Sequence, residues 1–331
     1  MKSVIRFVQI AALTSALLLA GQCFAESVIT TIPSATPEGV DVNPLTELVY
    51  VANFTNGTVS VIDEDTNTIV DTITFPSGSE MISVAVNPFT SRLYAADTLH
   101  TVLYVIDTNS NQIINTIAGL SGRLTVNPRT NKLYVSQFFG NSVAIIDGAN
   151  DTVIATVAVP FAEKAAVDLV TNRIYVPSQS FNGSIVVIDG LSNAIVATIG
   201  TGNFTTSVGV DFLRHLAYAS NQGFTPATNT LSVIDTITNT VVATILTDNR
   251  PTPVSVDPFT NRIYVATSFN SQNVVDIIDG NTLQIVNRLP LDPNASDSAI
   301  DLFHNLLYIT CPNFVFNTPG GNVTTVIDTR P

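Results

Sequence analysis

Few residues of this 331-residue chain have the types and spacings that nucleophilic, acid–base or metal chemistry requires. The three histidines lie far apart in the sequence, at His100, His215 and His304. No Gly-x-Ser-x-Gly elbow, P-loop or His-Glu-x-x-His motif is present. The sequence therefore predicts no catalytic residues, no metal site and no cofactor.

Phenylalanine is the residue type whose spacing suggests a function. Eight phenylalanines recur in short polar segments rich in Asn, Gln, Ser and Gly: Phe54, Phe138, Phe139, Phe181, Phe224, Phe269, Phe314 and Phe316. Aromatic rings gathered on one face can grip a peptide, a glycan or an apolar ligand. The alternative is that the rings fill gaps between neighbouring structural units. Either role requires a scaffold that brings these segments together.

The scaffold is indicated by a tyrosine that recurs every 40 to 46 residues between an apolar residue and a polar loop: Tyr50, Tyr94, Tyr134, Tyr175, Tyr218, Tyr264 and Tyr308. About fifteen residues later, at a variable distance, an apolar segment ends in aspartate: Asp63, Asp107, Asp147, Asp189, Asp235, Asp279 and Asp328. Such a period is typical of propeller blades, whose strands stay exposed until neighbouring blades cover them. The sequence therefore predicts an all-β, seven-bladed β-propeller of four-stranded antiparallel blades.

The second repeat shows how one blade is built. Its four strands are predicted at residues 83–86, 92–96, 101–106 and 112–117. Asn87-Pro88 begins the first turn, because Pro fixes φ and Asn bonds its own backbone. Cations follow this turn in four repeats, at Arg92, Lys132, Arg173 and Arg262. Each is expected to approach the aspartate that ends its own or an adjacent third strand, in pairs that are worth little if exposed.

Carboxylates near the first turns have two interpretations. Asp41, Asp168, Asp211, Asp257 and Asp301 are taken to occupy the places that Asn87 and Asn127 have in sister repeats. Turn chemistry is the simpler account, whereas a cluster of these groups in the central channel would indicate an enzyme. The segment 63–67 resembles a calcium loop only in part, because the glycine and closing glutamate of such loops are missing. An Asx-type hairpin turn is expected there.

The two ends of the chain are expected to share one blade. The last repeat has no fourth strand of its own, and residues 27–32 match the fourth strands of other repeats. Pairing of this segment with the strand that ends at Asp328 would close the ring and leave no open edge. The predicted organisation is a signal peptide at 1–25 and a propeller over 26–331, with blades near 34–75, 76–118, 119–159, 160–200, 201–246, 247–290 and 291–331 plus 26–33.

Export is expected from the N-terminal segment. Lys2 and Arg6 precede the apolar stretch 7–20, and Cys23-Phe24-Ala25 offers a small-x-small cleavage site. The stretch is shorter than the roughly 20 residues of a spanning helix, so no membrane span is expected in the mature chain. Cleavage would leave Cys311 as the only cysteine. The expected location is the periplasm, the cell surface or the extracellular space.

The charge balance argues against a nucleic-acid partner. The formal net charge is −13, and it becomes −15 when residues 1–25, which hold Lys2 and Arg6 and no acidic residue, are removed. Such a field repels nucleic acid. Only 12% of residues are charged and 45% are hydrophobic, which indicates an ordered body rather than a disordered acidic chain.

Three segments of the first repeat carry a recognisable pattern: Val49-Tyr50-Val51-Ala52-Asn53, Val59-Ser60-Val61-Ile62-Asp63 and Asn67-Thr68-Ile69-Val70. The pattern resembles the YVTN family of β-propellers, and the resemblance covers residues 26–331. It departs from the tetrad that names the family at 94–97, 134–137, 175–178 and 308–311. The resemblance implies an exported protein of the periplasm or of microbial surface layers, in most members without known catalytic activity. One periplasmic branch is connected with DNA binding.

Three functions stay open at this point. The first is a non-catalytic exported propeller that serves as a rigid binding or surface interaction module, with a protein, peptide or glycan partner on the phenylalanine-bearing loops. A monomer is expected. The first alternative is an enzyme of lyase or lactonase-like type at the channel mouth. The second alternative is a periplasmic nucleic-acid-binding propeller, against which the acidity and the absence of tryptophan argue.

Overall fold

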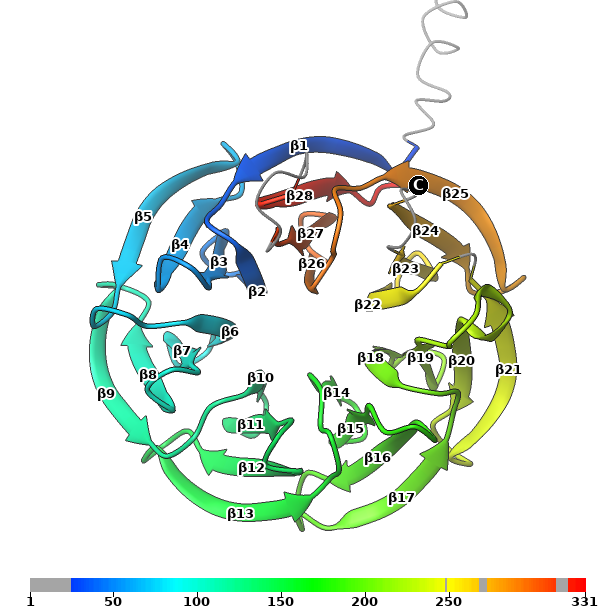
Figure 1. Cartoon of the computed structure of the whole chain (residues 1–331), viewed down its shortest axis with the longest axis horizontal. Helices are drawn as coiled ribbons and strands as arrows, with labels where there is room; N and C mark the ends of the chain where they lie inside the picture. The colour runs from blue at the N-terminus through cyan, green and yellow to red at the C-terminus, as the bar shows by residue number, and fades with distance from the viewer. Residues whose placement is uncertain (1–24, 248, 268–272, 314–320) are drawn as a thin grey trace, which may run out of the picture.

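A computed structural model describes residues 25–247, 249–267, 273–313 and 321–331. Within these ranges, 28 strands form seven four-stranded antiparallel sheets. The sheets stand around a central axis as the blades of a propeller (Figure 1). The expected all-β, seven-bladed architecture is therefore confirmed. No helix in the described part of the chain is long and apolar enough to cross a membrane.

Each blade runs from an innermost to an outermost strand. Blade 1 contains β2 (Pro37–Asn43), β3 (Leu48–Asn53), β4 (Thr58–Asp63) and β5 (Thr68–Thr74). Blade 2 contains β6 (Met81–Asn87), β7 (Arg92–Asp97), β8 (Val102–Asp107) and β9 (Gln112–Ala118). Blade 3 contains β10 (Arg123–Asn127), β11 (Lys132–Gln137), β12 (Ser142–Asp147) and β13 (Thr152–Ala158). Blade 4 contains β14 (Ala166–Asp168), β15 (Arg173–Ser178), β16 (Ser184–Asp189) and β17 (Ile195–Gly200).

The remaining blades follow the same order. Blade 5 contains β18 (Thr205–Asp211), β19 (Leu216–Asn221), β20 (Thr230–Asp235) and β21 (Thr240–Leu246), with the 3₁₀ turn η1 (Pro226–Thr228) between β19 and β20. Blade 6 contains β22 (Pro251–Asp257), β23 (Arg262–Thr267), β24 (Val274–Asp279) and β25 (Gln284–Pro290). Blade 7 contains β26 (Asp297–Asp301), β27 (Leu306–Cys311), β28 (Val323–Asp328) and β1 (Ser27–Pro33).

The ring closes through β1, the N-terminal strand. It pairs antiparallel with β28, from Ser27 opposite Asp328 to Pro33 opposite Val323, and forms the outer edge of blade 7 (Figure 1). The register shifts once, between Val28 and Thr30. The expected pairing of the two chain ends in one sheet is confirmed. The predicted signal peptide lies outside the described residues, apart from Ala25.

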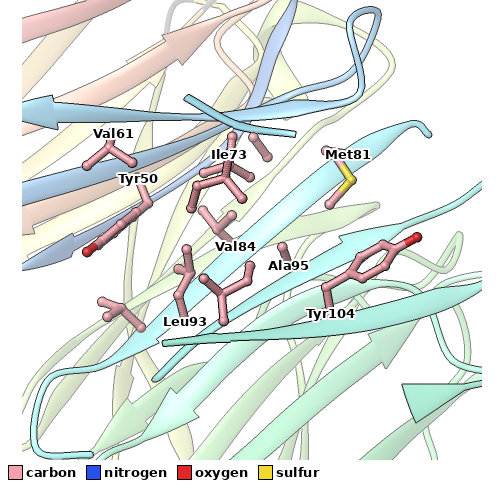
Figure 2. Packing of buried hydrophobic residues seen from close by; sticks show 12 residues of the cluster. Tyr50, Val61, Ile73, Met81, Val84, Leu93, Ala95 and Tyr104 are labelled. Carbon is pink, nitrogen blue, oxygen red and sulfur yellow. The ribbon is translucent and has the colours of Figure 1, made fainter. Parts of the chain in front are cut away.

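The hydrophobic core is divided among the seven junctions between blades. Each junction cluster contains one of the seven repeating tyrosines, and all seven tyrosines are at most 1% exposed. Figure 2 shows the first junction, where Tyr50 and Val61 of blade 1 face Val84 and Leu93 of blade 2. Because each blade is covered only by its neighbours, burial at these junctions holds the ring together.

Asparagine and aspartate shape the first turns as expected. The Asn43 side chain accepts the Leu45 amide at 3.1 Å, and Asp168 accepts the Val170 amide at 2.8 Å. The fifth turn residue has a positive φ, which Asn tolerates better than most residues; φ is 51° at Asn131. These turns also join neighbouring blades, and Asn127 donates to Asn172 Oδ1 at 2.8 Å.

The cations after the first turns follow the expectation only in part. Arg262 pairs with Asp279, which ends its own third strand, at 2.5 Å. Arg92 instead reaches Asp151 at 2.8 Å, past the aspartate that ends the third strand of blade 3. Lys132 donates to the Gly190 carbonyl and to Asn193 Oδ1. The positions of these partners depend on how far each blade is turned relative to the next, which the sequence does not show.

Candidate functional site

Phenylalanines from blades 3, 4 and 5 enclose a groove of about 600 Å³ on one face of the ring. Its apolar lining comes from two kinds of segment. Phe138, Phe181 and Phe224 lie in the loops between the second and third strands of their blades. Phe161 and Phe204 lie in the connections that lead into blades 4 and 5. Both kinds of segment therefore open on the same face, which we call the loop face.

The rings contact one another along the groove. Phe204 is 5.0 Å from Phe224 and 6.0 Å from Phe181, measured between ring centroids, and Phe181 is 5.6 Å from Phe224. Phe138 lies 5.4 Å from Phe161. The rings are tilted or perpendicular, as aromatic pairs prefer. They therefore present edges and gaps rather than one flat platform.

The phenylalanine rings of the groove differ from core residues in how much of their surface is exposed. Phe181 and Phe224 are each 62% exposed. Phe161 and Phe204 also have left-handed backbone, with φ of 47° and 50°. A bulky side chain in this region is an outlier that costs roughly 1–2 kcal/mol. Phe161, which is 41% exposed, combines exposure with strained backbone, and the two largely exposed rings contribute little to the core.

The eight phenylalanines singled out from the sequence are distributed unevenly. Phe138, Phe181 and Phe224 line the groove, and Phe139 lies beside Phe138 with its side chain 92% exposed. Phe54 is half-buried in blade 1 and does not line the groove. The other three, Phe269, Phe314 and Phe316, lie outside the described residues.

Two groove residues, Phe161 and Phe204, were not predicted from the sequence. The predicted site residues came only from the loops within blades and not from the connections between blades. The signal was available, because loops and connections alternate along the chain and must reach the same face of a four-stranded blade.

The opposite face, which we call the turn face, carries apolar side chains of a different kind. At least one is exposed in the first turn of six blades: Leu45, Phe89, Leu169 with Val170, Leu213, Phe259 and Phe303. They are spread around the ring. The loop face is therefore distinguished by rings from three blades that converge on one hollow.

The groove adjoins a second cavity of about 570 Å³ in the central channel. Gln179 and Gln222 line both cavities, so the groove leads to the channel mouth. Ion pairs join distant blades across this mouth. Lys164 contacts Asp297 at 2.6 Å, and a second pair at 3.1 Å connects Arg123 with Glu38. The channel mouth on the loop face is thus bridged by charged side chains.

Negative charge exceeds positive charge among the residues of this network. Burial raises the pKa of Glu163 to about 6, although Arg123 opposes the shift. Burial also raises the pKa of Asp41, against the opposing charge of Lys164. Burial alone would lower the pKa of Arg123, but the charges of Glu38, Glu163 and Asp297 raise it. A carboxyl whose pKa is about 6 and that lies near the Arg123 guanidinium can exchange protons close to neutral pH.

Asp41 corrects the expectation for the aspartates near the first turns. Asp168, Asp211, Asp257 and Asp301 each accept backbone amides within their turns, as predicted. Asp41 instead lies two residues before the turn residue Asn43 and lines the channel. It accepts the Val86 amide of blade 2 at 2.8 Å. The error arose because Asp41 was aligned with turn residues that it precedes.

Comparisons with known proteins identify the fold. No family model matches the chain, and no curated protein matches it. A chain in a crystal structure of a mitotic checkpoint complex matches with a TM-score of 0.79 at 14% identity, over 94% of each chain. A chain of Kuenenia stuttgartiensis hydrazine synthase matches with a TM-score of 0.76 at 16% identity, over 92% of this chain and 99% of that one. At such identities the likeness establishes a seven-bladed β-propeller and nothing about activity.

Proposed function

We propose that this protein is an exported, non-catalytic binding module whose groove on the loop face holds an extended peptide segment of an envelope or surface protein. The observation that carries the proposal is the convergence of Phe181, Phe204 and Phe224 on one hollow, with two of the rings 62% exposed. Contiguous exposed apolar surface of this kind marks interaction sites. The resemblance to the YVTN family supports export and a role at the cell surface.

The chemistry of the lining favours a peptide with apolar side chains. Gaps between tilted rings suit aliphatic or aromatic side chains, whereas a sugar ring stacks best on a flat platform. Gln179 and Gln222 supply amide groups that can pair with a peptide backbone. Arg250 is the one charged residue among the described groove residues, and no carboxylate lines the hollow.

Selection from a displayed peptide library tests the proposal. The mature chain, beginning at Glu26, is expected to enrich apolar segments. A groove variant, Phe181→Ser with Phe224→Ser, removes two largely exposed rings and should leave the fold intact. Each lost ring contact is worth about 1–2 kcal/mol, so the groove variant should bind selected peptides about 100-fold more weakly.

Phe259→Ser provides a matched control, because Phe259 is 64% exposed on the turn face. It should bind selected peptides as tightly as the unchanged chain. If the groove variant bound the selected peptides as tightly as the unchanged chain, the groove would not be their binding site. Export has a separate test: the chain isolated from its native cell should lie outside the cytoplasm and begin at Glu26.

A second function, an enzyme of lyase or lactonase-like type at the channel mouth, is favoured by one observation. Glu163, whose pKa is about 6, lines the same cavity as Arg123 and Lys164. A base near neutral pH beside cations that stabilise an oxyanion or enolate suits proton abstraction next to a carboxylate or lactone. Glu163→Gln should then abolish turnover of such substrates, while the groove variant retains it. Turnover unaffected by Glu163→Gln would end this alternative.

A further inference from the structure

The junction between blades 7 and 1 contains a histidine and two carboxylates that come from opposite ends of the chain. Asp301 and His304 lie in the turn between β26 and β27, and Asp301 Oδ2 is 2.8 Å from His304 Nδ1. The same turn holds Asp301 through its other oxygen, which accepts two backbone amides. A similar pair occurs at Asp97 and His100, at 2.7 Å, so such a pair needs no ligand by itself.

Glu64 distinguishes this junction from the other six. It follows β4 directly, where the sister repeats have only Thr or Gly: Thr108, Gly148, Gly190, Thr236, Gly280 and Thr329. Its side chain crosses the junction, and its Oε2 lies 3.5 Å from His304 Nδ1. The residue is 4% exposed. No other junction places a carboxylate at this position of the repeat.

The Glu64 carboxylate lacks the donors that a buried acid normally has. Neither of its oxygens accepts a hydrogen bond of normal geometry from the described residues, and the Tyr308 hydroxyl nearby offers only a weak one. An uncompensated buried carboxylate is costly and calls for an explanation such as an ion. The buried Glu64 carboxylate therefore indicates that an ion binds between these acidic residues.

The geometry suits a metal ion. One ligand atom from each of Glu64, Asp301 and His304 lies within 4.8 Å of the others. Ligand atoms around tetrahedral zinc are about 3.4 Å apart, so small side-chain movements would complete the shell. The other nitrogen of His304, Nε2, lies 3.4 Å from Glu47 Oε1. Metal-bound histidines commonly donate their second nitrogen to such a carboxylate.

We propose that Glu64, Asp301 and His304 bind one divalent transition-metal ion of the zinc type, with Glu47 orienting the histidine. An imidazole ligand favours zinc and its neighbours over calcium and magnesium, which prefer oxygen alone. The ion would join blade 1 to the C-terminal strands of blade 7. It would therefore act beside β1 as a second connection between the first and last repeats.

Zinc titration of the tag-free mature chain, stripped with EDTA and followed by calorimetry, tests the site. One saturable site is expected, and zinc should raise the melting temperature of the chain. The Glu64→Thr variant gives blade 1 the threonine that blades 2, 5 and 7 have at this position of the repeat, so the variant should fold. It should weaken zinc binding at least about 100-fold, and Glu47→Gln should weaken it about 10-fold.

His100→Thr is the matched control, because it removes the other Asp–His pair of the same spacing on the loop face. Its zinc affinity should equal that of the unchanged chain. Cys311 is fully buried and should not contribute. A folded chain that binds no zinc below about 100 μM would mean that Glu64 and Asp301 form only an acid–carboxylate pair, and the proposal would fail. It would fail equally if Glu64→Thr kept its affinity or if calcium bound more tightly than zinc.

Discussion

Removal of the closing strand is the sharpest perturbation of the fold. A chain that begins at Ser34 lacks β1, and with it the Ile32 side chain, which is 5% exposed in the core of the junction between blades 7 and 1. It also lacks Val28, which packs at the junction of blades 6 and 7. The loss of these two side chains alone amounts to about 3–5 kcal/mol. The lost pairing leaves β28 with an open edge.

Part of this loss is offset, because the residues of β1 no longer have to be ordered on folding. We therefore expect the free energy of unfolding to fall by about 3 kcal/mol, a large share of the 5–15 kcal/mol typical of folded proteins. Urea denaturation of the full and shortened mature chains measures this difference. An unchanged denaturation midpoint would refute closure by β1.

Rescue by the missing strand makes the test specific. A synthetic peptide of residues 26–34 should bind the shortened chain by β-strand addition and restore the denaturation midpoint. The same peptide with Ile32→Ser should restore it much less. If both peptides restored the denaturation midpoint equally, Ile32 would not stabilise the junction as inferred, even if the shortened chain were unstable.

Three further changes have defined outcomes. Tyr264→Phe should cost about 1 kcal/mol in urea denaturation, because the Tyr264 hydroxyl donates to the Thr329 carbonyl at 3.2 Å, whereas Tyr134→Phe should be nearly neutral; equal losses would contradict this. The pKa of Glu163 is higher in the folded chain than in the unfolded chain, so the unfolded chain loses the carboxyl proton first as the pH rises. The stability from this group is therefore greatest below about pH 4.5. It falls by at most about 2 kcal/mol by about pH 6. Glu163→Gln should remove that fall, and an unchanged stability–pH curve would show that Glu163 is not desolvated. Phe161→Asn should change the free energy of unfolding by less than about 1 kcal/mol, because relief of left-handed strain offsets the lost ring, and a larger loss would assign Phe161 to the core.

Strand pattern and turn chemistry were sufficient to predict the ring. The tyrosine series marked the junctions because each junction needs one large buried side chain from each blade. The match of residues 27–32 to the fourth strands predicted the shared blade. Both signals are local in sequence, repeated, and set by burial on a fixed period.

The sites depended on relations that the repeat pattern does not contain. Asp41 was misplaced because it lies two residues before the end of β2 and lines the channel, whereas the turn aspartates end their first strands. Glu64 and His304 are 240 residues apart and meet only because the ring closes. Phe161 and Phe204 belong to connections between blades, which vary from blade to blade although they reach the same face as the loops. For Glu64 and His304 the deciding fact is the position of blade 7 relative to blade 1.

Photo-cross-linking in the native cell tests the central claim of groove recognition most directly. Benzoylphenylalanine is placed at Phe224 in the groove and, in a second chain, at Phe259 on the turn face. We predict that the probe at Phe224 cross-links to an apolar extended segment of an exported protein, and that a synthetic peptide of that segment competes for it. The probe at Phe259 should not reach that segment. Equal cross-linking of the segment from both positions, or no cross-link from Phe224, would contradict the account.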